Sequence, residues 1–251
     1  MKDQREKTEM NRLMLAAAAL ALSAGMGMAQ TVRIATEGAY PPYNLVNDAG
    51  EVDGFEVELG NELCKRAELD CTWVKNDWDS IISNLNSSNY DAIMAGMSIT
   101  EERKQSVAFT QNYIPPTASA YAAPDAGVDV TTAVVAAQIS TIQAQYVAES
   151  GARLLEFATP DEAVGAVRDG QAEAVFADRD FLVPIVNESN GAMVWVEGQD
   201  NIPLGEGIGM ALRQSDTELK AKFDAAITSM KDDGTLNQLI SKWFGEEGVL
   251  Y

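Results

Sequence analysis

The chain has 251 residues, of which 46% are hydrophobic, so it is long enough to bury a substantial core in one large domain or two ordinary ones. Its 38 acidic and 18 basic residues give a net charge of −20, which repels phosphate backbones and anionic lipid, so no nucleic-acid partner is expected. The sequence contains no histidine, which excludes Ser-His-Asp and Cys-His catalysis and imidazole metal sites. We therefore predict a folded acidic protein with no metal or other cofactor.

The only long apolar run lies near the start of the chain, over residues 13–22, directly after a basic residue. It is shorter than the roughly 20 residues that a membrane span needs. The small residues Gly27 and Ala29 stand before Gln30, a pattern typical of a signal peptide. We predict export with cleavage near Ala29, which makes residues 1–29 the signal peptide, and both Met1 and Met10 are candidate start sites.

Two cysteines, Cys64 and Cys71, are the only ones in the sequence. An even count in an exported protein favours a disulfide, here closing the loop CKRAELDC. Two free thiols in the core are the alternative. A metal site is not expected, because neither a histidine nor a third cysteine is present to complete it.

The first half of the exported chain alternates short apolar runs with helical patterns. Such alternation predicts helix-covered sheets with parallel neighbouring strands. The expected elements are a strand over 32–36, an irregular loop up to a helix that begins near Phe55, a strand over 71–76, a helix over 79–87, a strand over 90–97, and a turn N-capped by Ser98 or Thr100.

Paired prolines interrupt this alternation between Tyr113 and Pro124, and we interpret that segment as a connection between two lobes. The expected elements after it are a strand over 131–139, a helix around 143–149, a strand over 154–157, a helix over 160–169, a strand over 173–178, a return strand over 205–213 and two C-terminal helices. In open α/β sheets, ligands bind outside the carboxyl ends of the strands. Those ends read TEGAY, NDW, AGMSIT, ISTI and ADR, and we expect them to face one cleft.

Several motifs together resemble the amino-acid-binding periplasmic solute-binding proteins of ABC transporters, the group that includes lysine/arginine/ornithine, histidine and opine receptors. The resemblance covers essentially the whole exported chain. Its motifs are ATEGAYPPYN (35–44), VDGFEVELGNELCKR (52–66), WDSIISNL (78–85), YDAIMAGMSITEERKQSVAFT (90–110), AVFAD (174–178) and DDGTLNQLISKWFG (232–245).

The resemblance implies an α/β, two-lobed periplasmic-binding-protein fold of type II, in which each lobe is a mixed sheet flanked by helices and two hinge crossings join the lobes. We expect residues 30–116 and 208–251 to form lobe 1 and residues 117–207 to form the inserted lobe 2. It also implies a periplasmic location and an inner-membrane ABC permease as partner. We expect a monomer.

The family's roles for the ligand's α-carboxylate and α-ammonium fall on four residues. Arg103 matches the arginine that grips the ligand carboxylate, for which a planar bidentate fork suits better than lysine. Ser98 matches a backbone and hydroxyl contact, and Thr141 matches a second-lobe donor to the carboxylate. Asp178 matches the second-lobe aspartate that takes the ammonium.

The family's side-chain pocket falls on four more residues. Tyr40 and Trp78 match the aromatic pair that sandwiches the ligand side chain, where ring faces attract cations. Gly96 lies where some relatives carry a serine. Glu37 occupies the position of an aspartate that pairs with the distal cation, which favours arginine, ornithine, lysine or a related opine. One departure is Ser140, which stands where relatives usually have glycine, a residue that permits positive φ.

We therefore expect a receptor, not an enzyme, that closes on a cationic amino acid and delivers it to a transporter. One alternative is a dehydratase of the prephenate or arogenate type on the same fold. Another is the same receptor fold with a polar neutral amino acid as ligand. A sensory module acting with a separate signalling partner is the third.

Overall fold

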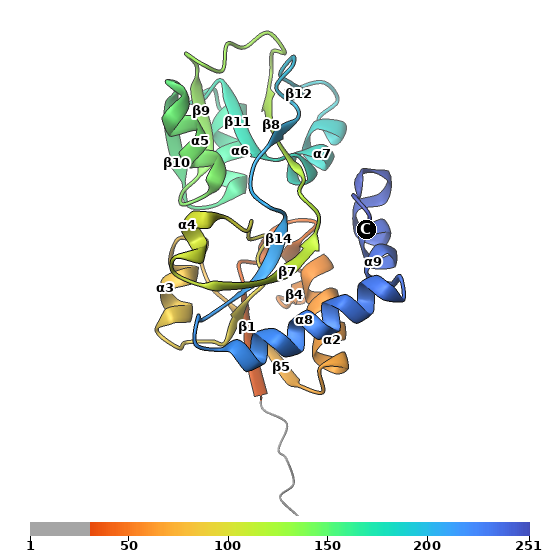
Figure 1. The fold of residues 1–251 in the computed structure, drawn as a ribbon. Helices are drawn as coiled ribbons and strands as arrows, with labels where there is room; N and C mark the ends of the chain where they lie inside the picture. The colour runs from red at the N-terminus through yellow and green to blue at the C-terminus, as the bar shows by residue number, and fades with distance from the viewer. Residues whose placement is uncertain (1–30) are drawn as a thin grey trace, which may run out of the picture. The chain divides into compact units, whose positions relative to one another are not determined.

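The computed structural model of the protein describes residues Thr31–Tyr251. The predicted signal peptide, its cleavage near Ala29 and the choice between Met1 and Met10 lie outside the described residues. Within the described part, no helix is both long and apolar enough to cross a membrane. Two separate helix-flanked sheets make up this part of the chain, and a smaller third sheet lies beside the first (Figure 1).

The first sheet is mixed and has five strands. β1 (Thr31–Thr36) pairs in parallel with β5 (Asp70–Lys75) and with β6 (Ala92–Ile93). β14 (Ile208–Leu212) runs antiparallel between β6 and β7 (Ala108–Ile114). The late strand β14 thus completes a sheet that the first half of the chain began, as the predicted return strand required.

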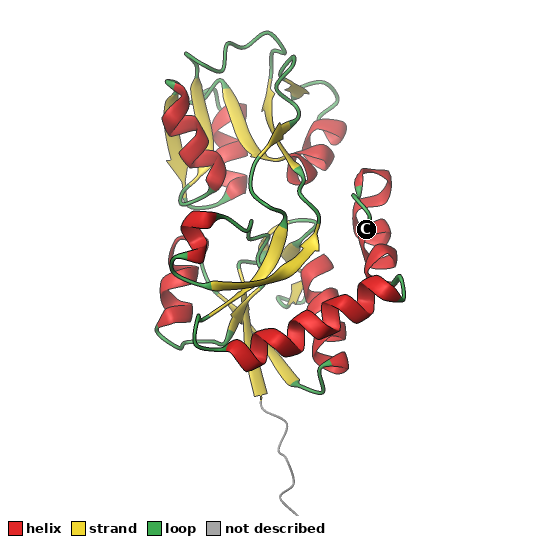
Figure 2. Cartoon of the chain, viewed as in Figure 1, coloured by secondary structure: helices red, strands yellow, loops and turns green. Residues whose placement is uncertain are grey.

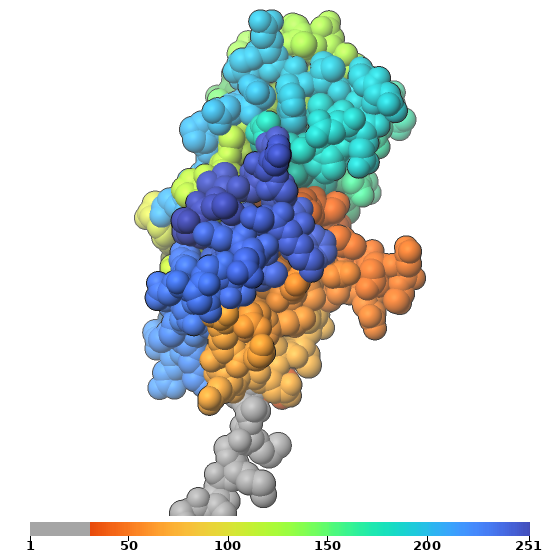
Figure 3. Space-filling model, turned by 90° about the vertical axis from the view of Figure 1, so that its right-hand side faces the viewer, coloured from red at the N-terminus to blue at the C-terminus, as the bar shows by residue number. Residues whose placement is uncertain are grey.

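Helices cover both faces of the first sheet (Figure 2). Along β1, Val32 and Ile34 enter one core cluster and Ala35 enters the other, which is the period of two expected for a strand buried on both sides. The helices are α2 (Phe55–Arg66), the 3-10 turn η1 (Trp78–Ser80), α3 (Ile81–Asn86), α4 (Glu101–Lys104), α8 (Thr217–Asp232), α9 (Thr235–Phe244) and the turn η2 (Gly245–Glu247). In blue, α8 and α9 lie over the orange segment that contains α2 (Figure 3).

The second sheet is also mixed, in the order β10-β9-β11-β8-β12, with β13 pairing β8 as well. β9 runs parallel to β10 and β11, whereas β8 runs antiparallel to its neighbours. Its strands are β8 (Ala118–Ala123), β9 (Val134–Gln138), β10 (Arg153–Phe157), β11 (Ala174–Asp178), β12 (Val194–Trp195) and β13 (Ile202–Pro203), and its helices are α5 (Ile142–Ser150), α6 (Pro160–Arg168) and α7 (Arg179–Glu188).

The start of α6 shows why the chain turns helical there. Thr159 accepts a hydrogen bond from the Glu162 backbone N–H, and the Glu162 side chain accepts one from the Thr159 backbone N–H. Pro160 occupies the first turn, where its missing N–H costs nothing. The same capping logic starts α4, where the Thr100 hydroxyl accepts from the Arg103 backbone N–H, so of the two predicted caps Thr100 is the correct one.

Two expectations about the elements were wrong, and a third was correct only in part. The predicted loop before Phe55 contains a small antiparallel sheet of β2 (Ala39–Tyr40), β3 (Asn44–Val46) and β4 (Val52–Asp53), whose strands are too short to show an alternating pattern. The predicted strand over 90–97 shrinks to β6. The segment between Tyr113 and Pro124 does connect the two large sheets, as predicted, but only through residues 115–117. The rest of it belongs to the strands β7 and β8, whose small residues pack as buried sheet positions.

The chain passes between the two large sheets twice, after β7 and before β14 (Figure 1). These two connections touch: a Cβ added to Gly207 would lie 2.5 Å from the Ile114 carbonyl oxygen. Gly207 also has φ +91°, a conformation that other residues rarely adopt. The exact division into lobes, 30–116 with 208–251 against 117–207, stays a prediction.

The predicted disulfide is present and joins Cys64 on α2 to Cys71 on β5. It ties the end of the helix to the edge strand of the first sheet. Because the bridge closes only a short loop, its effect on the entropy of the unfolded chain is at the lower end of what disulfides contribute.

We expect replacement of both cysteines by alanine to lower the free energy of unfolding by about 2 kcal/mol. Urea unfolding of the oxidised protein and of the double variant measures the difference. A reducing agent should shift the unfolding midpoint of the parent protein and leave the variant unchanged. Equal midpoints for parent and variant would contradict a stabilising role for this bridge.

Candidate functional site

A cavity lies between the two large sheets. It contains residues from each of the five segments whose strand ends were expected to face one cleft. All eight predicted site residues line it. Its lining residues are Glu37, Tyr40, Trp78, Ala95, Gly96, Ser98, Arg103, Gln138, Thr141, Ile142, Gln143 and Asp178.

Arg103 is the one cation among these lining residues. It belongs to the short helix α4, and its guanidinium donates to the Ser98 carbonyl at 2.9 Å and, across the cavity, to the Ser140 carbonyl at 3.3 Å. It also lies over the ring of Trp78, with Cζ 5.2 Å from the ring centroid. Burial lowers the pKa of Arg103 to about 10, so the group stays charged at neutral pH.

Asp178 ends β11 and is buried at 8% exposure. Its carboxylate accepts from the Tyr40 hydroxyl at 2.7 Å and from the Gln143 amide at 3.0 Å. Burial raises the pKa of Asp178 to about 6, with Asp180 adding to the rise, while the Tyr40 hydrogen bond and the charge of Arg103 oppose it. The Tyr40 contact joins the first half of the chain to the second sheet.

Glu37 follows β1 and is buried at 4% exposure. Its carboxylate accepts one hydrogen bond, from the Gln138 amide at 2.6 Å, and forms no ion pair within the described residues. Burial is the main reason that the pKa of Glu37 rises to about 7, although the Gln138 hydrogen bond opposes the rise. Among the lining residues, Glu37 is thus the carboxylate with the fewest partners.

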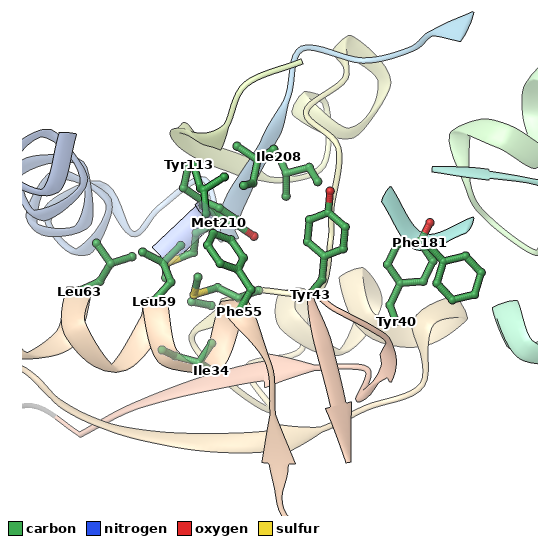
Figure 4. Close-up of a cluster of buried hydrophobic side chains, with 14 of the residues drawn as sticks. Ile34, Tyr40, Tyr43, Phe55, Leu59, Leu63, Tyr113, Phe181, Ile208 and Met210 are labelled. Atoms are coloured by element: carbon green, nitrogen blue, oxygen red, sulfur yellow. The ribbon is translucent and has the colours of Figure 1, made fainter. Parts of the chain in front are cut away.

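The two aromatic residues each have one ring face covered by the protein. Tyr40 stacks on Phe181 with ring centroids 4.6 Å apart, as Figure 4 shows, and Arg103 covers a face of Trp78. Gly96 brings backbone close to the Tyr40 ring, since a Cβ at Gly96 would lie 3.2 Å from that ring. A ligand sandwiched between Tyr40 and Trp78 stays a prediction.

Thr141 is the N-cap of α5. Its hydroxyl accepts from the Ala144 backbone N–H at 3.1 Å and donates to the Gln138 carbonyl at 2.7 Å. The hydroxyl is therefore occupied in both directions, and the free donors at this point are the backbone N–H groups of the first helical turn. The preceding residue, Ser140, has φ +59° and so adopts the left-handed conformation for which glycine is suited.

A buried carboxylate outside the predicted set supports the cavity from beneath. Glu56 on α2 is fully buried and accepts from the Gly96 backbone N–H at 2.7 Å, from the Asn44 amide at 2.8 Å and from the Tyr113 hydroxyl. Asn44 in turn accepts from the backbone N–H of Gly38, the residue after Glu37. Glu56 thereby fixes two of the loops that line the cavity.

The sequence reasoning missed Gln138, Gln143 and Glu56. Gln138 was the last polar residue of the predicted strand over 131–139, and the strand end was placed one residue too late. Gln143 lies in the first turn of α5, and the sequence alone does not indicate whether its side chain faces the cavity or solvent. Glu56 lies in α2, which is predicted from the spacing of its apolar residues, and that spacing carries no information about a buried glutamate.

The raised pKa of Glu37 predicts how the stability of the ligand-free protein changes with pH. The folded state holds this proton up to about pH 7, whereas an unfolded glutamate loses it near its ordinary pKa of 4.5. Glu37 therefore contributes stability that is fully present below pH 4.5 and is lost as the pH rises to 7, on the order of 3 kcal/mol.

Glu37→Gln should flatten the decline in the free energy of unfolding between pH 5 and pH 8, measured by urea unfolding at each pH. Glu51→Gln, at an exposed loop position, is the matched control and should leave the parent profile unchanged. A Glu37→Gln profile that parallels the parent would contradict the argument.

The chain is similar to known proteins in both sequence and fold. Residues 32–246 match the model of the family described as bacterial extracellular solute-binding proteins, family 3. A crystal structure of a periplasmic His/Glu/Gln/Arg/opine family-binding protein from Silicibacter pomeroyi in complex with lysine is 68% identical, with a TM-score of 0.85, and the match covers 88% of this chain and 100% of that one.

Two curated relatives match over most of their length. The lysine/arginine/ornithine-binding periplasmic protein of Escherichia coli K12 is 31% identical over 239 residues, covering 89% of this chain and 91% of the relative. The L-arginine-binding protein of Pseudomonas aeruginosa is 31% identical over 226 residues, covering 85% and 87%.

Proposed function

Because the chain belongs to the bacterial extracellular solute-binding proteins of family 3, we propose that it captures a cationic amino acid in the periplasm for an ABC transporter. The family consists of solute-binding proteins and not of enzymes, so the chain acts by binding. The curated relatives named above are binding proteins and not dehydratases, which argues against the dehydratase alternative.

The observation that carries the proposal is the charge content of the cavity. One guanidinium, Arg103, and two carboxylates, Asp178 and Glu37, line the same cavity. A basic amino acid carries one carboxylate and two cationic groups, which is the complementary set. Buried charges are costly unless they are paired, so a ligand that pairs all three would be bound selectively.

Each ligand group would have its own partner. The α-carboxylate would bind Arg103, with Ser98 and the backbone N–H groups at Thr141 as further donors. The α-ammonium would bind Asp178, and the distal cation would bind Glu37. The aliphatic part of the side chain would lie along Tyr40, Trp78 and Gly96. The names of the relatives support this choice, since they report lysine, arginine and ornithine as ligands.

Binding would stabilise a closed arrangement of two lobes. Arg103 and Glu37 belong to the part of the chain predicted as lobe 1, and Asp178 to the predicted lobe 2. A ligand that contacts both lobes interacts fully only when they are closed, and this difference in free energy shifts the population toward closure.

Export and delivery complete the proposal. Residues 1–29 would direct the chain to the periplasm and be removed near Ala29. The exported protein would act as a monomer and pass its ligand to an inner-membrane ABC permease.

A polar neutral amino acid is the second candidate ligand. The observation that favours it is the pKa of Glu37, raised to about 7 by burial, because a protonated Glu37 could hydrogen-bond an uncharged side chain. Lower pH would then favour neutral ligands and higher pH would favour cationic ones.

A thermal-shift screen tests the proposed function directly. The exported protein, unfolded and refolded to remove bound ligand, is heated with each of the twenty amino acids, ornithine, citrulline and octopine-type opines. A ligand at 100 times its dissociation constant adds about 2.7 kcal/mol of apparent stability. We expect shifts with lysine, arginine or ornithine; shifts with neutral or acidic amino acids alone would refute the cationic assignment.

Arg103→Ala should abolish binding of the ligand found in that screen. The ligand carboxylate would then be buried without its charge partner, at a cost of several kcal/mol. Isothermal titration calorimetry measures the loss, and Arg168→Ala, at an exposed position, is the matched control that should bind normally. Retained micromolar affinity in Arg103→Ala would remove Arg103 from the site.

A further inference from the structure

Outside the cavity, the first turn of α7 makes two further contacts between the parts of the chain predicted as lobes. The Asp180 carboxylate accepts a hydrogen bond from the Tyr43 hydroxyl at 3.0 Å, across 137 positions of the chain. The neighbouring Arg179 forms an ion pair with Glu247 in η2. Tyr43 and Glu247 fall in predicted lobe 1, and α7 falls in predicted lobe 2. None of these four residues lines the cavity, so the contacts are separate from the proposed ligand site.

Tyr43 is held firmly on the lobe 1 side. Its side chain is fully buried, and its ring packs against Phe244 and Phe55 with ring centroids 4.9 Å and 6.4 Å apart. Figure 4 shows Tyr43 between Phe55 and Tyr40. Phe244 ends α9, and η2 with Glu247 follows directly. Because the packed ring cannot move on its own, its hydroxyl meets Asp180 only when α7 lies against this aromatic cluster.

Asp180 depends on that hydroxyl. It is 9% exposed, and among the described residues Tyr43 is the only group that donates a hydrogen bond to its carboxylate. Burial raises the pKa of Asp180 and the charge of Glu247 adds to the rise, whereas the Tyr43 hydrogen bond and the charge of Arg179 oppose it. A buried carboxylate that loses its donor is costly, so Tyr43 and Asp180 can separate readily only if water reaches both.

The ion pair contributes less. The side chains of Arg179 and Glu247 are 28% and 46% exposed, and exposed ion pairs contribute little to stability. Arg179 is also held on its own side, since its guanidinium lies over the Trp195 ring with Cζ 5.3 Å from the ring centroid. The hydrogen bond between Tyr43 and Asp180 is therefore the stronger of the two contacts.

We propose that the hydrogen bond between Tyr43 and Asp180 is a latch, which stabilises the closed arrangement from outside the cavity and raises the affinity for every ligand by the same factor. This inference rests on the proposed function, since it requires two lobes that close on a ligand. Separating the lobes breaks the bond, so its free energy favours closure whichever ligand is bound. An apparent dissociation constant is the intrinsic constant divided by the closed fraction, so a contact that raises this fraction lowers all dissociation constants alike.

The latch acts mainly on the release of the ligand. A ligand enters while the lobes are apart and the bond is absent, whereas it leaves only after the bond has broken. The dissociation rate constant therefore depends on the latch, and the association rate constant depends on it little. Selectivity stays with the cavity residues, because neither Tyr43 nor Asp180 is among those that line the cavity.

The test removes one hydroxyl group. Tyr43→Phe keeps the aromatic packing and leaves Asp180 buried without its donor in the closed protein. We expect the dissociation constant of each basic amino acid that the parent binds to rise about tenfold, measured by calorimetry. The ratio between the constants of lysine and arginine should stay within about twofold of the parent ratio. Stopped-flow fluorescence should show the loss in the dissociation rate constant.

Tyr90→Phe is the matched control. Tyr90 is also buried, and its hydroxyl donates to the Ile81 carbonyl within the part of the chain predicted as lobe 1. Like Tyr43→Phe, this variant removes a buried tyrosine hydroxyl that has a partner. It should lower the free energy of unfolding and keep the parent dissociation constants, because its bond does not join the two lobes.

Variants of Asp180 test the other partner. Asp180→Ala removes the acceptor and should weaken binding as Tyr43→Phe does, whereas Asp180→Asn retains an oxygen that accepts and should bind more tightly than Asp180→Ala. The double variant of Tyr43→Phe with Asp180→Ala should lose no more affinity than the weaker single variant, because both changes remove one bond. The two Asp180 variants also decide the question if Tyr43→Phe does not fold, which circular dichroism reports.

The outcomes separate this inference from the proposed function. A parent protein that binds no basic amino acid refutes the proposed function itself. A parent that binds one, with an unchanged dissociation constant in Tyr43→Phe, overturns only the latch. A loss that differs between ligands, or that lies in the association rate constant, also overturns it, since the bond would then act on the ligand or on its entry. An equal loss in Tyr90→Phe would show a general effect of destabilisation and would overturn the latch as well.

Discussion

Two buried carboxylates and one half-buried guanidinium lie together in this protein without neutralising one another. Within the described residues, Arg103, Asp178 and Glu37 line one cavity, yet no ion pair joins any two of them. Neutral partners compensate the charges instead: carbonyl oxygens for the guanidinium, a tyrosine hydroxyl and amide groups for the carboxylates. Such compensation is incomplete in a desolvated site, and the raised pKa values of both carboxylates reflect it. The residues around the cavity therefore hold three charged side chains that have no oppositely charged partner among themselves.

Holding that pattern requires rigid support, and a second buried carboxylate supplies it. Glu56 lies beneath the cavity and accepts hydrogen bonds from three donors, so its carboxylate holds three separate segments of the chain together. Through Gly96 and Asn44 it ties together loops that follow different strands. The arrangement separates two tasks: Glu56 is saturated and structural, whereas Glu37 is left with accessible capacity. Burial alone does not distinguish them, since both are almost fully enclosed; the number of donors does.

Elements that depend on a local residue pattern could be predicted from the sequence. Elements and contacts that depend on residues far away in the chain could not. The strand over 32–36, the helix from Phe55 and the Thr100 cap follow from spacing and capping, and the structure contains them. The strands β7 and β8 could not be recognised, because they form by antiparallel pairing with β14 and β11, which lie far away in the sequence. Likewise, the eight site residues came from motifs, while Gln138 becomes notable only when it lies opposite Glu37, 101 positions away in the chain.

The contact between the two connections limits how the sheets can move. The Gly207 backbone rests against the Ile114 carbonyl so closely that no side chain fits between them, and the two connections continue into the paired strands β7 and β14. Because β7 and β14 are paired neighbours in the first sheet, both connections leave that sheet at the same place. Any motion of one large sheet relative to the other would therefore bend both connections together, at one place in the chain's path.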